Sequence, residues 1–316
     1  MNKPMVSIIV NCFNGAMTLN RALDSIFSQT FTNWEIVFWD NVSTDNSAEI
    51  ARSYGSKLRY FSATENTNLS VARQEALQRC RGEYVAFLDC DDIWYPNKLE
   101  LQLKKIEGTD FIVCYAGVNE VFSNGEVIRS LVPTYEDGNQ FANHLEQFDI
   151  NMVTPLIRMA ALTDHGITIN PKINSSVEYN LFMQLAMVGG FCTVKVVLGE
   201  WTIYNDSLTN QSIEFWSKDR RCTLECLKSA RPELVNMYAK QFNLAYATGD
   251  YYEARFLISN NNWAGARRVL KNNAAYSKTF FLLWVLSMIP GLWRLLHNEG
   301  LKRVLSVYVL RKSKSA

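Results

Sequence analysis

Three carboxylates fall within four residues, directly after an apolar run. Asp89, Asp91 and Asp92 follow residues 84–88, whose length and composition predict a buried strand of a parallel sheet. Ligand crevices of open α/β sheets lie at the carboxyl ends of such strands. A turn capping the helix that begins near Pro96 would explain one carboxylate, but three like charges this close together need a cation among them. The spacing therefore favours a metal site.

Alternating strand and helix patterns must position this acidic run. Apolar runs at residues 6–10, 35–39 and 58–61 predict strands, and helical periodicity lies between them. Further strands are expected at residues 111–115 and 118–122, with a hairpin turn at residues 123–125. The fold class predicted is α/β, a mostly parallel sheet flanked by helices and followed by a C-terminal helical region. The sequence lacks G-x-G-x-x-G after its first strand and a Walker A loop, which disfavours dehydrogenases and P-loop kinases.

Composition narrows the class of protein further. The chain is 48% hydrophobic and 20% charged, typical of a globular protein with a sizeable core. Its seven cysteines form no C-x-x-C pair and its three histidines are scattered, so zinc sites and Ser-His-Asp triads are disfavoured. The apolar run near the N-terminus is too short and too β-like for a signal peptide. Free thiols in a chain without an export signal favour a reducing cytoplasm.

Basic and apolar residues are concentrated at the C-terminus. Residues 276–316 contain seven lysines and arginines against one glutamate, so residues 1–275 are net acidic. Residues 280–289 are apolar but too few to span a bilayer, and residues 301–308 fit an interfacial amphipathic helix, with a packing helix as the alternative. A membrane-surface partner is expected. No nucleic acid is expected, because no basic patch lies near the acidic run.

Five motifs in order over about the first hundred residues resemble those of family 2 glycosyltransferases. They are residues 6–14, 23–31, 39–47, 68–73 and 87–92. The resemblance implies the Rossmann-like GT-A fold, a nucleotide-diphosphate-sugar donor, and Asp89-Cys90-Asp91 as the metal-binding D-x-D element. Oxygen ligands that bridge a diphosphate favour Mg²⁺ or Mn²⁺ as the cofactor.

The same resemblance assigns roles residue by residue. It implies donor-binding residues after each of the first four strands, with Arg73 early in the helix that follows the third, and metal ligands in the acidic run. The donor-binding residues are Cys12, Asn14, Asp40, Asn41, Arg73 and Asp89, and the metal ligands are Asp91 and Asp89. Asp40 could accept a hydrogen bond from the base, or only cap a turn, and Asn14 could be only a turn former. Arg73 could meet the diphosphate or orient the acids, rather than being a surface arginine.

The candidate catalytic base lies in a predicted helix near residues 175–186. Glu178 falls in its first turn, where it could simply complement the helix dipole. The segment resembles the family's Glu-Asp helix, whose second acid is the base, and Val177 replaces the first acid. Further on, Thr202 and Tyr204 stand where the family's closing loop usually has Arg and His.

These features predict a metal-dependent, inverting glycosyltransferase in cell-surface polysaccharide biosynthesis. The partners expected are a UDP-sugar foremost among the donors, a glycan or polyprenyl-linked acceptor, and the cytoplasmic face of the inner membrane, held peripherally. The alternatives are a non-catalytic sugar-nucleotide-binding partner in an assembly complex and a phosphotransferase of the Asp-x-Asp phosphatase type. The domains predicted are residues 1–107 (donor half), 108–212 (acceptor half), 213–275 (helical hairpin) and 276–316 (basic membrane-associating tail).

Overall fold

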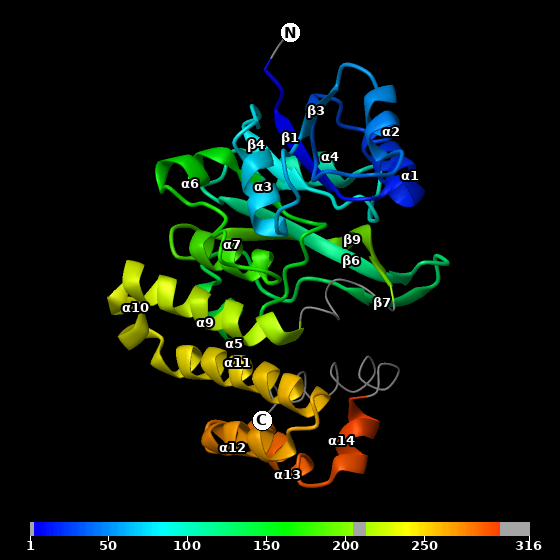
Figure 1. Ribbon diagram of the computed structural model, residues 1–316. Coiled ribbons are helices and arrows are strands. Elements are labelled where there is room, and N and C mark those ends of the chain that lie inside the picture. Colours follow the sequence, from blue (N-terminus) through cyan, green and yellow to red (C-terminus); the bar gives the residue numbers. More distant parts are fainter. Residues whose placement is uncertain (1–2, 205–212, 298–316) are drawn as a thin grey trace. The chain divides into compact units, whose positions relative to one another are not determined.

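The computed structural model describes residues 3–204 and 213–297. The chain forms two compact units, residues 1–210 and 211–316 (Figure 1). The first unit contains a mixed sheet with helices around it, and the second, over residues 213–297, consists of helices joined by short turns. Residues 205–209 of the predicted closing loop, which spans residues 201–209, and the predicted amphipathic helix at residues 301–308 lie outside the described residues.

The first unit begins with alternating strands and helices. In chain order these are β1 (Val6–Cys12), α1 (Ala16–Phe27), β2 (Trp34–Asp40), α2 (Ser47–Ser53), β3 (Leu58–Ser62), α3 (Leu69–Leu77) and β4 (Tyr84–Phe87). It continues with β5 (Ile93–Trp94), α4 (Lys98–Ile106), β6 (Val113–Phe122), β7 (Val127–Leu131), α5 (Phe141–Glu146), β8 (Leu156–Arg158), α6 (Met159–Asp164), α7 (Val177–Ala186) and β9 (Phe191–Ile203). The predicted α/β class is confirmed.

The sheet places the carboxyl ends of β1, β2, β3 and β4 along one edge. Within the described residues its order is β3-β2-β1-β4-β8-β6-β9-β5, with β7 paired to β6. The first four strands are parallel, and Cys12 pairs in register with Asp40, which pairs with Ser62. Their carboxyl ends therefore meet at the edge where the chain leaves β4 and enters the acidic run.

The sequence pattern was wrong about one strand boundary. Residues 111–115 and 118–122 were expected to form two strands, but Val113–Phe122 is one strand, β6, whose pairing with β9 shifts register around Gly117. A Cβ on Gly117 would lie 2.9 Å from the carbonyl oxygens of Leu131 and Val196, so only glycine lets the neighbouring strands come this close. The predicted hairpin turn after β6 is confirmed, with Gly125 at φ 85°.

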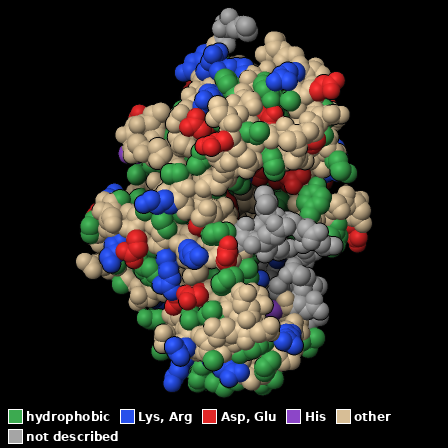
Figure 2. Space-filling view, viewed as in Figure 1, with side chains coloured by type: hydrophobic (Ala, Val, Ile, Leu, Met, Phe, Trp, Pro, Cys, Tyr) green, Lys and Arg blue, Asp and Glu red, His purple; other side chains and the backbone are tan. Residues whose placement is uncertain are grey.

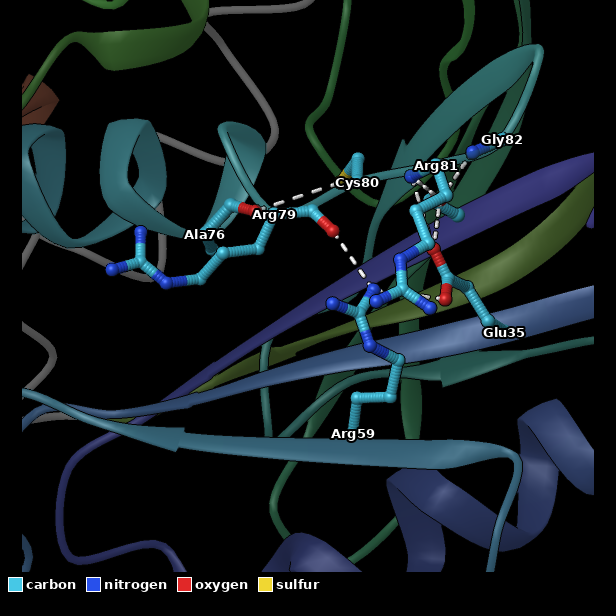
Figure 3. Close-up of polar contacts among 8 residues, drawn as sticks. Glu35, Arg59, Ala76, Arg79, Cys80, Arg81 and Gly82 are labelled. Atoms are coloured by element: carbon cyan, nitrogen blue, oxygen red, sulfur yellow. Dashed lines mark hydrogen bonds and ion pairs between the residues drawn. The ribbon is translucent and has the colours of Figure 1, made fainter.

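A buried carboxylate holds the strands together at their amino-terminal ends (Figure 3). Glu35 accepts hydrogen bonds from the Ser7 hydroxyl at 2.7 Å, the Arg81 N–H at 3.0 Å and the Arg59 guanidinium at 3.0 Å. The Ser7 oxygen in turn accepts from the N–H of Gly82 at 2.8 Å. Hydrogen bonds to this carboxylate are charge-assisted, and they link β1, β2, β3 and the turn before β4. They therefore stabilise the strand register, and this register also aligns the carboxyl ends of the same strands at the other edge.

A buried lysine lies in the first turn of α4. Lys98 is completely buried, and its Nζ donates to Gln102 Oε1 at 2.7 Å and lies 4.0 Å from the centre of the Trp94 ring. Gln102 is itself bound to the carbonyl oxygens of Cys114 and Thr154 at 2.8 Å. Burial lowers the pKa of Lys98 from the ordinary 10.5 to about 7.

This lysine predicts a pH dependence of stability. Between pH 7 and 10.5 the unfolded chain binds a proton that the folded chain has lost, so the free energy of unfolding increases with pH there. The unfolding free energy of the wild type minus that of Lys98→Met should therefore become more positive by up to about 1.4 kcal/mol per pH unit above 7. Urea denaturation at pH 7, 8 and 9 measures it. Lys104→Met, on the exposed side of the same helix, should give no such slope, and equal slopes for both variants would contradict the prediction.

The second unit contains six helices within residues 213–297. They are α9 (Ile213–Ala230), α10 (Pro232–Met237), α11 (Ala239–Ser259), α12 (Trp263–Asn273), α13 (Lys278–Leu286) and α14 (Pro290–Leu296). Ala254, Ala266, Leu270 and Trp293 form the small core that joins α11, α12 and α14. Residues 213–275, predicted as a helical hairpin, are helical and hold four of the six helices.

Candidate active site

The acidic run forms a tight turn that is held from β9. The Asp92 N–H donates to the Asp89 carbonyl at 3.1 Å, and Asp92, buried to 2% exposure, accepts from the Thr202 N–H at 2.8 Å. The Thr202 hydroxyl donates to the Asp91 carbonyl at 2.6 Å. Asp92 and Thr202 therefore fix the turn, which leaves Asp89 and Asp91 as the carboxylates available for a ligand.

Arg73 reaches this turn from α3. One guanidinium nitrogen lies 2.7 Å from both carboxylate oxygens of Asp89. Arg73 is 2% exposed, and its Nε is buried without a hydrogen-bond partner among the described residues. The arginine therefore orients Asp89 from inside the protein. The structure brings together Arg73 and Asp89 as the sequence predicted, and the interpretation of Arg73 as a surface arginine is wrong.

The turn carries more negative charge than its protein partners neutralise. Burial, followed by the charge of Asp89, raises the pKa of Asp91 to about 6. Burial, followed by the charges of Asp91 and Asp89, raises the pKa of Asp92 well above its ordinary value. A raised carboxyl pKa means that the ionised form is destabilised, and a cation bound beside Asp91 would relieve this cost. The residues present thus fit a divalent cation.

The protein offers only part of a coordination shell. Among residues 3–204 and 213–297, no group of three or more histidine, cysteine or acidic side chains is placed to hold a metal ion by itself. Mg²⁺ is characteristically bound by one or two carboxylates together with substrate phosphates and water, rather than in an all-protein cage. Asp91 and Asp89 suit that arrangement, with a donor diphosphate completing it.

The loops after β1 and β2 are tied to each other. Asn14, at φ 52°, accepts from the Thr44 N–H at 2.8 Å. Asp40 is 2% exposed, and its two oxygens accept from the Ser43 N–H at 2.7 Å and the Tyr60 hydroxyl at 2.5 Å. Both side chains thus have the turn-forming contacts that were the alternative interpretation. Donor binding by either one stays a prediction.

Two further donor-binding candidates have structural contacts. The Asn41 side chain donates to the Thr67 carbonyl at 2.8 Å and accepts from the Thr67 N–H at 3.2 Å, so it connects the loops after β2 and β3. Cys12 ends β1 beside Cys90, and a hydrogen bond from Cys90 lowers the pKa of the Cys12 thiol to about 7, against the opposing effect of burial. Their roles toward a donor are also untested predictions.

Glu178 lies in the first turn of α7, as the sequence predicted. Val177 beside it is completely buried, which explains why an apolar residue stands where the family has an acid. The segment that leads into α7 is bound to the start of α3, because Asn68 donates to the Pro171 carbonyl at 3.0 Å. The helix that carries Arg73 therefore also anchors the approach to Glu178.

Sequence reasoning missed the function of Thr202. The position was interpreted as a lost arginine, whereas the threonine holds the acidic turn through its N–H and its hydroxyl. Tyr204 lies near the same turn, since burial and then the charge of Asp91 raise the pKa of its phenol. A hydroxyl residue at a strand end is too common a signal for the sequence to have shown either relation.

Three features define a GT-A fold: the parallel first half of the sheet, the acidic turn after β4, and β9, which pairs with β6 and holds that turn. Residues 7–162 match the family model described as glycosyl transferase family 2, and this part of the chain belongs to that family. The match gives no support to the Asp-x-Asp phosphatase alternative.

Three comparisons illustrate the relationship. The chain is 31% identical over 133 residues to UDP-Glc:alpha-D-GlcNAc-diphosphoundecaprenol beta-1,3-glucosyltransferase WfgD of Escherichia coli, covering 42% of this chain and 52% of WfgD. It is similar to S. aureus TarS 1-349 in complex with UDP-GlcNAc, at a TM-score of 0.65 and 16% identity, over 98% of this chain and 91% of TarS 1-349. The mannosyltransferase PcManGT from Pyrobaculum calidifontis, in complex with GDP-Man and Mn²⁺, gives a TM-score of 0.56 at 17% identity over 95% of this chain and 89% of that protein. The chain spans about a fifth to somewhat over half of the length of the curated relatives that it matches.

Proposed function

We propose that this protein is an inverting glycosyltransferase that moves a sugar from a nucleotide-diphosphate donor to a glycan or polyprenyl-linked acceptor. The observation that carries the proposal is the excess negative charge of the Asp89–Asp92 turn at the carboxyl edge of a family 2 domain. A divalent cation at Asp91 and Asp89 would neutralise charge on the departing nucleoside diphosphate. Mg²⁺ or Mn²⁺ is proposed, because the ligands are oxygens and a structural neighbour carries Mn²⁺.

The protein's own residues have distinct tasks in this reaction. Arg73 holds Asp89 in a fixed orientation through its two 2.7 Å contacts, so that the donor site is formed before substrate arrives. Glu178 would accept the proton of the acceptor hydroxyl, whose oxygen attacks the anomeric carbon in line. A single displacement inverts the configuration and needs no carboxylate nucleophile, unlike a retaining glycosidase.

The donor and acceptor classes rest on similarity. A structural neighbour is described with UDP-GlcNAc, and a curated relative is described as acting on a diphosphoundecaprenol-linked sugar. A UDP-sugar and a lipid-linked acceptor are therefore proposed, in cell-surface polysaccharide biosynthesis.

The second unit supports a peripheral location at the cytoplasmic face of the inner membrane. Figure 2 shows hydrophobic side chains over the part of this unit formed by α13 and α14, with lysines and arginines beside them. Phe281, Leu282, Ile289 and Leu295 are each about half exposed, and residues 276–297 contain Lys278 and Arg294 but no acid. Within the described residues, no helix has the length and apolar character needed to cross a bilayer. An apolar surface with basic neighbours suits an anionic membrane surface.

The test is release of nucleoside diphosphate from UDP-, GDP- and dTDP-sugars, with Mg²⁺ or Mn²⁺, in the presence and absence of a membrane extract. Glu178→Gln should lower turnover by about 10²–10⁴-fold, because the amide cannot accept the proton, while donor binding measured by calorimetry is unchanged. Glu126→Gln makes the same change at an exposed acid of the turn between β6 and β7, and serves as the matched control. Full activity of Glu178→Gln would show that the base lies elsewhere.

The replacement of the family's Arg and His by Thr202 and Tyr204 favours one competing function. A chain with weaker contacts to the diphosphate could bind a sugar nucleotide without turning it over, as a partner in an assembly complex. Tight binding of one donor, with no product from any acceptor in the membrane extract, would support that function over catalysis.

A further inference from the structure

Two cysteines face each other across the strands that carry the acidic turn. β1 and β4 are parallel, with Ile9 opposite Phe87, and the Leu88 N–H continues the ladder to the Ile9 carbonyl at 3.0 Å. Cys90 lies three residues past the end of β4, in the acidic turn, and its side chain is hydrogen-bonded to that of Cys12. Cys12 is the last residue of β1, and Cys90 lies between Asp89 and Asp91.

The two sulfur atoms share one small space. The position that a Cβ on Gly15 would take is 2.7 Å from Cys90 Sγ and 2.9 Å from Cys12 Sγ. Glycine at position 15 leaves this space empty, so no side chain of that residue separates the sulfurs. Because both distances are measured from one point, the two sulfur atoms lie at most 5.6 Å apart.

Solvent access distinguishes this pair from the other strand-paired cysteines. Cys90 is partly exposed, whereas Cys12 is 2% exposed. Cys114 and Cys192 are register partners on the parallel strands β6 and β9, but both are completely buried. Within the described residues there are thus two similar cysteine pairs, and of these two only the one at the acidic turn can be reached from solvent.

We propose that Cys12 and Cys90 form a modification site, a reversible disulfide produced by hydroperoxides. One sulfur attacks an oxygen of the peroxide, the O–O bond breaks, and water or an alcohol leaves with the thiol proton. The second sulfur loses its proton and attacks the resulting sulfenic sulfur. The S–S bond forms, the S–O bond breaks, and a second water leaves. Two thiols are oxidised and one peroxide is reduced.

The bond changes the acidic turn. A disulfide draws Cys90 toward the end of β1, and Asp89 and Asp91 are its immediate chain neighbours, so both carboxylates shift from their reduced positions. Arg73 then no longer meets Asp89 in the same geometry. Loss of donor binding is the expected consequence, and this consequence alone rests on the proposed function. A thiol reductant restores the reduced turn.

The test counts thiols and needs no activity. The full-length protein carrying Cys222→Ser and Cys226→Ser, which removes the two helical cysteines of the second unit, is treated with hydrogen peroxide and then denatured in N-ethylmaleimide. Intact mass should show the loss of two maleimide adducts, reversed by dithiothreitol. A peptide map should join the segments that contain Cys12 and Cys90. UDP-sugar binding is measured on the same samples.

Matched variants separate this site from general oxidation. Cys114→Ser, in the buried pair, should lose two adducts as before, whereas Cys90→Ser should lose none. Cys12→Ala repeats the second result if Cys90→Ser fails to fold. Linkage of Cys114 to Cys192, loss of two adducts in Cys90→Ser, or oxidation of Cys90 to sulfinic acid with Cys12 free would overturn the proposal. A disulfide that forms in a protein with no donor binding would overturn only the proposed function.

Discussion

Replacing Asp91 by asparagine should make the protein more stable and inactive. Burial and the charge of Asp89 raise the pKa of Asp91 to about 6, above the ordinary 3.8. Between these two values the folded chain binds more protons than the unfolded chain, so stability decreases as pH rises from 3.8 to 6 and stays lowered at neutral pH. Asparagine removes this cost, and the free energy of unfolding at pH 7 should rise by about 1–3 kcal/mol. Turnover should fall by about 10³-fold or more, because the metal-binding charge is lost.

Thermal melts with and without divalent cations measure the change in stability and the loss of cation binding in one experiment, and nucleoside diphosphate release measures the turnover. Mn²⁺ together with UDP should raise the Tm of the wild type, because ligands that bind only the folded state stabilise it. They should leave the Tm of Asp91→Asn unchanged. Asp110→Asn, at an exposed acid, is the control and should behave as wild type. A less stable Asp91→Asn at pH 7 would show that the carboxylate has a structural partner rather than an open ligand position.

The parallel half of the sheet could be predicted because its signals are local. β1, β2 and β4 are buried along their whole lengths, so the sequence shows them as continuous apolar runs, and a polar loop follows each at the carboxyl end. The second half was harder, since its order, β8-β6-β9-β5, joins strands distant in the chain. β8 is three residues long and β5 two, too short for any periodic pattern.

The candidate site could be predicted in part for the same reason. Asp89, Asp91 and Arg73 lie in motifs whose residues are close in sequence, and the structure places Arg73 on Asp89. The contacts of Thr202 with the turn cross about a hundred residues, and neither partner has an unusual local pattern. The Cys12–Cys90 pair depends equally on sheet register, which no local signal specifies.

Replacing Arg73 by methionine should have the second large effect, of a different kind. Arg73 is 2% exposed and neutralises Asp89 at 2.7 Å, so its removal leaves a carboxylate beside Asp91 and Asp92 without its cation. Breaking such a pair costs about 3–5 kcal/mol when both partners are buried, and somewhat less is expected here because the Asp89 side chain is 37% exposed. Arg73→Lys retains the charge, but its shorter side chain ends in an ammonium group that lacks the planar guanidinium, so Asp89 is no longer held in the same orientation. It should keep most of the stability and lose about tenfold or more in kcat/KM.

A double-mutant cycle separates the stabilising role of Arg73 from its role in the reaction. In Arg73→Met with Asp89→Asn, the unpaired charge is gone, so most of the lost free energy of unfolding should return. Activity should not return, because the oriented carboxylate that the turn presents to the donor is missing. Urea denaturation gives the four free energies, and nucleoside diphosphate release gives the four rates. If the double variant regained turnover along with stability, Arg73 and Asp89 would be a structural pair only, and the metal site would consist of Asp91 without Asp89.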